Sequence, residues 1–232
     1  MNTDLILCAA IVSKKDEEKL QQVIKNLEKH KFNNKYLLFD GPPPSQLKGV
    51  YDRYTKYKKS YKESYPDFEF IENTDCKYYR KTLETFVREN YSALAENLLI
   101  VQDDVVVDDF DLEKVLETKA DFSECKILYF RENRKRAPHW FNVIDDSKVL
   151  IKTHGWSERA YLITKEHLID ILNNLPSKGG CNGKFIEFYY HNMMQRKTWE
   201  TITMEEQLEY WKKWGCYEHN DIHHKHLATK RS

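Results

Sequence analysis

The chain has 232 residues, of which 41% are hydrophobic and 13% aromatic, enough for one α/β domain with a sizeable core. Its 37 basic and 37 acidic residues give a formal net charge of zero, whereas nucleic-acid-binding proteins usually carry a basic excess. The same balance offers no general attraction to an anionic membrane. We therefore expect no nucleic-acid partner.

The sequence has neither the features of a membrane span nor those of a disulfide framework. The longest early apolar run, residues 5–12, is too short to cross a bilayer, and no basic segment precedes it as in a signal peptide. The five cysteines are odd in number and include no C-x-x-C pair. These features predict a protein without a transmembrane segment, located in the cytoplasm.

Short apolar runs alternate with amphipathic helices in the first half of the sequence. Buried strands are expected at residues 5–12, 36–39, 68–71, 98–101 and 126–130. Helices are expected over residues 77–90 and from Ser13 onward, the latter with an apolar face of Leu20, Val23, Ile24 and Leu27. This alternation predicts an α/β fold with a mostly parallel central sheet flanked by helices, as in Rossmann-like folds.

The second half of the sequence is less regular. A strand is expected at residues 160–163, followed by a helix with an apolar face of Leu168, Ile171, Leu172 and Leu175. A further helix is expected over residues 203–214. We therefore expect a single domain, 1–232, in which a regular sheet region (1–130) is joined by a smaller irregular region (131–232).

Polar residues follow several of the predicted strands, at the edge where parallel sheets bind ligands. Ser13, Asp40, Asp103 and Asp104 all lie at such strand ends. The adjacent carboxylates of Asp103 and Asp104 repel each other unless a cation lies between them. Hard oxygen ligands suit Mg²⁺ or Mn²⁺, so one interpretation is a metal site. The alternative is a solvated turn after the strand.

Residues 97–107 read Asn-Leu-Leu-Ile-Val-Gln-Asp-Asp-Val-Val-Val. This segment resembles the motif of GT-A glycosyltransferases, in which apolar residues precede and follow (D/E)-x-D. The resemblance implies a GT-A-like fold, a divalent ion (Mn²⁺ or Mg²⁺) and a nucleotide-sugar donor, with a UDP-sugar as first choice. By position it makes Asp104 a metal ligand. Gln102 replaces the usual first acid, so either Asp103 supplies the missing carboxylate or the metal has fewer protein ligands.

The same resemblance implies donor contacts elsewhere in the first half. Asp40 would bind the uracil or ribose, and Arg80 occupies roughly the place of a donor-binding arginine in many GT-A enzymes. Ser13, at the end of the first strand, would face the same nucleotide. The alternatives are an Asp-Gly turn at Asp40 and an ordinary surface cation at Arg80. On this reading residues 1–130 bind the nucleotide sugar, and residues 131–232 bind the glycan acceptor.

The C-terminal segment is rich in histidine. In many GT-A enzymes a late histidine completes the metal site, and a following basic residue neutralises the diphosphate. The resemblance implies His224 as the ligand, or His226 on the same face of an extended chain, with Lys230 or Arg231 as the cation. We expect this segment to be mobile until the donor binds. The alternative is a disordered polar tail.

Residues 155–164, Gly-Trp-Ser-Glu-Arg-Ala-Tyr-Leu-Ile-Thr, resemble a segment of transferases that build lipopolysaccharide or viral capsid glycans. An enzyme that inverts the anomeric configuration needs a carboxylate to deprotonate the acceptor. Glu187, among apolar and aromatic neighbours, is the first candidate for this base, and Glu158 is the second. The alternative for Glu187 is a residue on the surface of a helix.

The sequence thus predicts a metal-dependent hexosyl- or pentosyltransferase that acts on a glycan or another hydroxyl acceptor. One alternative is a sugar nucleotidyltransferase, although the first strand is not followed by the glycine-rich loop that this activity generally needs. Another is a noncatalytic RNA- or protein-binding module that uses a lysine-rich helix. The aromatic residues of that helix are Tyr51, Tyr54, Tyr57, Tyr61 and Tyr65. We expect these tyrosines to pack on the domain instead.

Overall fold

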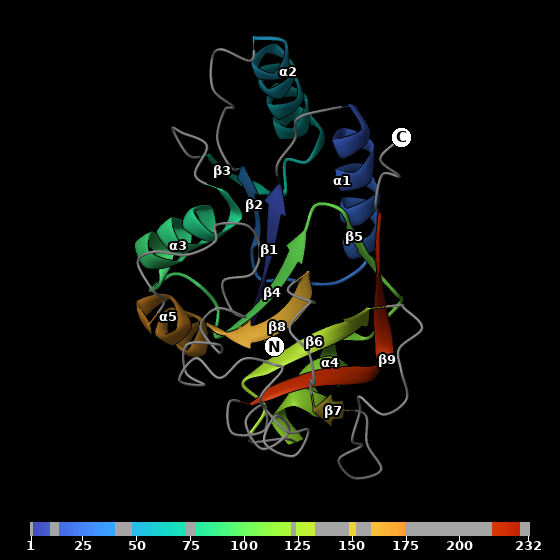
Figure 1. Ribbon diagram of the computed structural model, residues 1–232, viewed down its shortest axis with the longest axis vertical. Helices are drawn as coiled ribbons and strands as arrows, with labels where there is room; N and C mark the ends of the chain where they lie inside the picture. The colour runs from blue at the N-terminus through green and yellow to red at the C-terminus, as the bar shows by residue number, and fades with distance from the viewer. Residues whose placement is uncertain are drawn as a thin grey trace, which may run out of the picture.

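The computed structural model describes residues 2–9, 14–39, 48–72, 78–121, 124–132, 149–151, 159–174 and 215–227. Within these ranges lie five helices and a nine-stranded sheet (Figure 1). The fold is α/β, as the sequence predicts. None of the described helices is long and apolar enough to cross a membrane.

The first half of the chain forms the regular part of the sheet. Its elements are β1 (Thr3–Ala9), α1 (Lys14–Leu27), β2 (Lys35–Phe39), α2 (Lys48–Ser64), β3 (Glu69–Glu72), α3 (Tyr78–Asn90) and β4 (Asn97–Gln102). The strands lie in the order β3-β2-β1-β4, and every neighbouring pair is parallel. The strands expected in this region are all present. β1 ends at Ala9, and residues 10–13 lie outside the described chain.

The remaining strands extend the sheet beyond β4. The elements are β5 (Val105–Val107), α4 (Leu112–Asp121), β6 (Ile127–Glu132), β7 (Val149–Ile151), β8 (Ala160–Thr164), α5 (Lys165–Asn174) and β9 (Cys216–His226). From β4 the order continues β8-β6-β9-β5, and β7 also pairs with β9. β6 and β9 run in the direction of β1 to β4, whereas β5, β7 and β8 run the opposite way. The described sheet is therefore mostly parallel, as expected.

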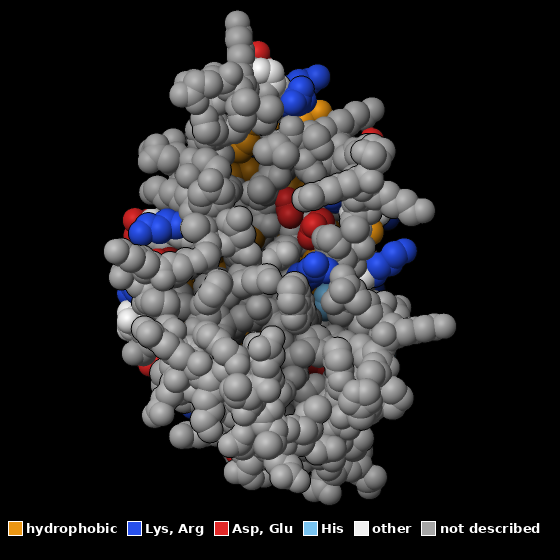
Figure 2. Space-filling view, in the orientation of Figure 1, with side chains coloured by type: hydrophobic (Ala, Val, Ile, Leu, Met, Phe, Trp, Pro, Cys, Tyr) orange, Lys and Arg blue, Asp and Glu red, His pale blue; other side chains and the backbone are white. Residues whose placement is uncertain are grey.

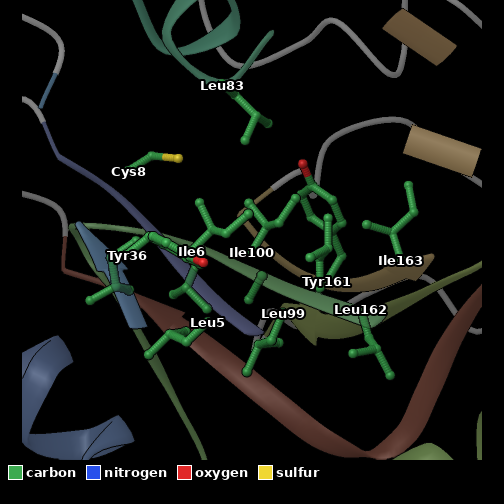
Figure 3. Close-up of a cluster of buried hydrophobic side chains, with 14 of the residues drawn as sticks. Leu5, Ile6, Cys8, Tyr36, Leu83, Leu99, Ile100, Tyr161, Leu162 and Ile163 are labelled. Carbon is green, nitrogen blue, oxygen red and sulfur yellow. The ribbon is translucent and has the colours of Figure 1, made fainter. Parts of the chain in front are cut away.

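The core lies on both faces of the parallel strands. Every residue of β1 is buried, so neither face of this strand is open to solvent. In Figure 3, Leu83 of α3 lies over the face that carries Ile6 and Ile100, whereas Leu5 and Leu99 point to the other face. The predicted apolar face of α1 is at most 1% exposed in each of its residues, which are Leu20, Val23, Ile24 and Leu27. The helical periodicity of the sequence therefore identified a real core surface.

The tyrosine-bearing helix α2 packs on the domain, as expected. Tyr54 and Tyr61 are buried, and Tyr57 and Tyr65 pack against the core, whereas Tyr51 is 42% exposed. The Tyr61 hydroxyl donates to the carbonyl of Glu17 in α1 (2.8 Å). Burial raises the pKa of Tyr61 far above its ordinary value. These side chains hold α2 in place and are not presented as a row of stacking surfaces.

A buried carboxylate joins three segments at the start of the sheet. Asp4 is fully buried in β1, and its Oδ1 accepts hydrogen bonds from both the backbone N–H and the side-chain amide of Asn34 (each 3.0 Å). Its Oδ2 accepts from the N–H of Ala95 at 2.8 Å. Asp4 therefore connects β1 to the segment before β2 and to the segment before β4.

We expect Asp4→Ala to lower the free energy of unfolding by roughly 3 kcal/mol, because it removes a buried carboxylate that accepts three hydrogen bonds and leaves the buried Ala95 N–H without its acceptor. Urea denaturation of the variant and the parent measures the difference. Asp52→Ala, at an exposed position of α2, is the control, and its effect should stay within about 0.5 kcal/mol. Equal stability of both variants would contradict this role for Asp4.

Candidate active site

The two acidic residues after β4 form a tight connection to β5. Asp103 and Asp104, here called the acidic turn, lie between Gln102 at the end of β4 and Val105 at the start of β5. The N–H of Asp103 donates to the carbonyl of Cys8 (3.1 Å), which attaches the turn to the C-terminal part of β1. The turn therefore lies at the sheet edge where parallel strands bind ligands.

The strand β9 lies beside the acidic turn, although it comes from the C-terminal part of the chain. β9 is antiparallel to β5, with Val105 opposite His226 and Val107 opposite His224. One residue further along, the N–H of Leu227 donates to the carbonyl of Asp104 at 2.7 Å. The fold thus joins the histidine-rich segment to the acidic turn.

A bulge in β9 makes this pairing possible. Phe130 of β6 lies opposite His219, but the next residue, Arg131, lies opposite His223. Residues 220–222 are skipped in this register, and β9 bends between its two ends (Figure 1). The first part of β9 pairs with β6 and β7, and the last part reaches β5.

The expectation of a mobile C-terminal segment is wrong for residues 216–227. Ile222 is 7% exposed and His224 is fully buried, so this stretch belongs to the core. Its polar composition is that of a loop, yet the sheet buries Glu218, His219 and His224. Residues 228–232, with Lys230 and Arg231, lie outside the described chain.

The two candidate metal-binding histidines occupy different positions along β9. His224 is buried beside β6, where its Nδ1 lies 2.7 Å from the carbonyl oxygen of Phe130. Because a carbonyl only accepts, Nδ1 carries the proton of this hydrogen bond. The backbone of His226 lies opposite Val105, directly after the acidic turn, and its side chain is not described. By strand position His226 is the nearer of the two, by roughly 7 Å along the strand.

A basic residue that was not predicted lies next to the acidic turn. The N–H of Gln102 donates to the carbonyl of Arg159 (2.9 Å), which places the start of β8 against the end of β4. Arg159 is partly exposed. In Figure 2, acidic side chains gather in the middle of the face, where β1 and β4 end in Figure 1, and basic and histidine side chains lie beside them. In the sequence this arginine belongs to the segment 155–164, which was interpreted only as a short motif and not as a source of site residues.

No protein-family model and no curated protein matches this chain. Solved glycosyltransferase structures do resemble it. The crystal structure of GalNAc-T7 with UDP, GalNAc and Mn²⁺ aligns with the whole chain at a TM-score of 0.61 and 9% identity, over 44% of its own length. Mannosyltransferase PcManGT from Pyrobaculum calidifontis, with GDP-Man and Mn²⁺, aligns with the whole chain at 0.60 and 13% identity, over 58% of its length. Residues 1–349 of S. aureus TarS, with UDP-GlcNAc, align with 82% of this chain at 0.51 and 15% identity, over 54% of that structure.

The chain has a GT-A fold. It spans about half the length of the GT-A structures that it resembles. The acidic turn is the part of the sequence that resembles the GT-A motif, and it directly follows β4.

The acidic turn carries carboxylates of the ligand type that divalent ions prefer. Asp104 Oδ1 is shielded from solvent, and carboxylate oxygens with an imidazole nitrogen suit Mn²⁺. Among the described side chains, no group of three or more His, Cys, Asp or Glu could hold a metal ion. The acidic turn therefore offers two carboxylates without a third ligand beside them among the side chains that the structure describes.

Most other candidate site residues lie outside the described part of the GT-A fold. These are Ser13, Asp40, Glu158, Glu187, Lys230 and Arg231. Arg80 is in the first turn of α3, and only its backbone is described. Their assigned roles stay predictions.

The acidic residues after β5 have ordinary structural roles. Asp111 caps α4, since its Oδ1 accepts hydrogen bonds from the N–H groups of Glu113 (3.0 Å) and Lys114 (3.4 Å). Asp109 forms an exposed ion pair with Lys29, which gives no reason to place it in the site.

Proposed function

We propose that this chain is a glycosyltransferase that moves a hexosyl or pentosyl group from a nucleoside diphosphate donor, with a UDP-sugar as first choice. The acceptor is a hydroxyl group of a glycan or a similar molecule. The observation that carries the proposal is the contact between the acidic turn and β9, made by the Leu227–Asp104 hydrogen bond and the His226–Val105 pair. This contact joins carboxylates and a histidine position at the ligand-binding edge of the sheet.

In this proposal Asp104, Asp103 and His226 hold a divalent ion, Mn²⁺ or Mg²⁺. Such an ion supplies positive charge to the diphosphate and stabilises it as a leaving group. His224 is the alternative imidazole ligand, because the hydrogen bond from its Nδ1–H to the Phe130 carbonyl fixes the tautomer in which Nε2 carries the lone pair. The same hydrogen bond supports the strand that carries His226.

The remaining roles are assigned by position in the sequence. Asp40, Ser13 and Arg80 contact the nucleotide, and Lys230 or Arg231 neutralises the diphosphate. If the reaction inverts the anomeric configuration, Glu187 deprotonates the acceptor, with Glu158 as the second candidate. The division into a donor half, 1–130, and an acceptor half, 131–232, belongs to the same proposal, as does a cytoplasmic location.

Structures with bound ligands support the choice of donor and metal. GalNAc-T7 was crystallised with UDP and Mn²⁺, PcManGT with GDP-Man and Mn²⁺, and TarS with UDP-GlcNAc. We extend this ligand class to the present chain because Asp103 and Asp104 directly follow its β4. No described feature favours the nucleotidyltransferase alternative, and the burial of Tyr54 and Tyr61 argues against base stacking along α2.

A thermal-shift screen of UDP, GDP and CDP, each with Mn²⁺ or with a chelator, tests the proposal. We expect UDP with Mn²⁺ to raise the melting temperature, since a ligand at about one hundred times its Kd stabilises the fold by about 2.7 kcal/mol. UDP with the chelator should have little effect. His226→Ala should reduce the Mn²⁺-dependent shift, whereas His223→Ala, three positions earlier on the same strand, should retain it. A chain that no nucleoside diphosphate stabilises, with Mn²⁺ or Mg²⁺, would contradict the proposal.

A further inference from the structure

A cavity lies at the opposite edge of the sheet from the acidic turn. It has a volume of about 540 Å³ and is lined by the start of β1, the segment after α1 and the start of α4. Thr3, which lines it, is the first residue of β1, whereas Cys8, which holds the acidic turn, is near its end. At about 3.3 Å per residue, the two sites are roughly 17 Å apart along the strand.

Two residues that line this cavity each have a buried polar atom that makes no hydrogen bond. These atoms are Thr3 Oγ1 and His30 Nε2. Both residues line the cavity, and Thr3 is only 1% exposed. Buried polar groups in folded proteins nearly always have a partner, so two such atoms at one cavity point to a hydrogen-bonding ligand.

Aromatic rings form another part of the wall. The His30 ring stacks on Phe110 with centroids 4.0 Å apart and an angle of 25° between the planes. Phe32 meets the same histidine edge-on, with a centroid distance of 6.2 Å. The cavity therefore combines flat apolar surfaces with hydrogen-bonding groups, the usual composition of a small-molecule site.

The charges around the cavity are balanced. Burial, together with the nearby Lys29, lowers the pKa of His30, so its ring is neutral at pH 7. The lining contains Lys29 and Lys31 but also Asp111 and Glu113. Outside the lining, Asp109 pairs with Lys29 and Lys114 pairs with Asp111, which adds one charge of each sign. Positive and negative groups around the cavity are equal in number, so the cavity has no net charge with which to select an ion.

We propose that this cavity binds an uncharged, hydroxyl-rich ligand of the size of a monosaccharide or disaccharide. Ligand hydroxyls would complete the hydrogen bonds of Thr3 Oγ1 and His30 Nε2, while C–H groups of the ligand pack on Phe110 and Phe32. The site lies beyond the proposed transfer reaction and does not depend on it. In an enzyme that extends a glycan, it would hold a remote part of the acceptor and raise its local concentration.

NMR titration of the full chain with lactose, maltose and N-acetylglucosamine tests this site directly. We expect amide shifts at Thr3, Asn33 and Phe110 that saturate with sugar concentration. Thr3→Val keeps the shape of the side chain and removes the hydroxyl, so it should weaken binding about tenfold. His30→Phe keeps the ring stack and should weaken binding to a similar degree.

Stability provides a second readout that distinguishes a ligand site from a structural role. Thr3→Val should melt at a higher temperature than the parent without sugar, because it removes an unsatisfied buried hydroxyl. The control is Thr118→Val, a buried threonine outside the cavity lining whose hydroxyl donates to the carbonyl of Lys114 (2.8 Å). Thr118→Val should leave sugar binding unchanged and should not raise the melting temperature.

Three outcomes would overturn the proposal. They are the absence of saturable shifts with all three sugars, unchanged binding in both Thr3→Val and His30→Phe, and equal binding of glycerol, which would show an unselective polyol pocket. Binding of UDP with Mn²⁺ is measured separately at the acidic turn. Failure at one site therefore leaves the result at the other intact.

Discussion

A chain that ends after Asp221 is expected not to fold. The deletion removes Ile222 and His224 from the core and takes away the strand partner of β5. It also removes the hydrogen bond between Leu227 and Asp104. We expect a loss of about 5 kcal/mol or more, comparable to the whole stability of many domains. Circular dichroism and urea denaturation measure this effect.

The matched control ends after Leu227 and keeps all of β9. It should fold with nearly the stability of the full chain, because every described contact of β9 is retained. If Lys230 or Arg231 neutralises the diphosphate, its turnover should fall by about a hundredfold, the scale of losing one such electrostatic contact. A folded, soluble chain ending at Asp221 would contradict the structural importance of the β5–β9 pair.

The second large effect is expected at the acidic turn. Asp104→Asn should reduce turnover of a nucleotide sugar by about a thousandfold, because the amide is a poor ligand for the ion that stabilises the leaving group. The fold should remain intact, since the carbonyl that accepts from Leu227 belongs to the backbone. Steady-state kinetics with a saturating divalent ion, together with a melting curve, separates the two effects.

Asp108→Asn is the control for charge removal close to the site. Asp108 follows β5 directly and is exposed, and its carboxylate lies 3.5 Å from the His223 imidazole. Its replacement should leave turnover within about threefold of the parent, since a surface pair of this kind contributes little. Similar losses in both variants would indicate a general electrostatic effect and not metal binding by Asp104.

The regular part of the fold was predictable because its signals are local. The apolar stripe of α1 and the run Leu98–Val101 before the acidic turn follow the periods of a helix and of a buried strand. The motif at residues 97–107 then located the end of β4. The hydrogen bond from the Asp103 N–H to the Cys8 carbonyl attaches this end to β1, at the sheet edge where a ligand site was expected. These inferences need only a few neighbouring residues.

β9 could not be predicted in the same way, because its residues are stabilised by distant partners. Glu218 and His224 are fully buried yet polar, so they interrupt the alternation that identifies a strand. The His224 contact with Phe130 joins residues 94 positions apart in the sequence. The cavity near Thr3 was missed for a similar reason, since Thr3, His30 and Phe110 come from three separate segments.

The pairing of β5 with β9 also affects how the protein is made. During synthesis the acidic turn and β5 leave the ribosome long before β9, and β9 is the strand with which β5 pairs in the described sheet. The nascent chain can form the parallel β3-β2-β1-β4 sheet early, since domains fold from the N-terminal side as they emerge. Formation of the proposed ion site must wait for a contact of high sequence separation, which is intrinsically slow. The ribosome-bound intermediate therefore carries adjacent carboxylates without their histidine strand, so affinity for ion and nucleotide should arise only after translation has passed residue 227.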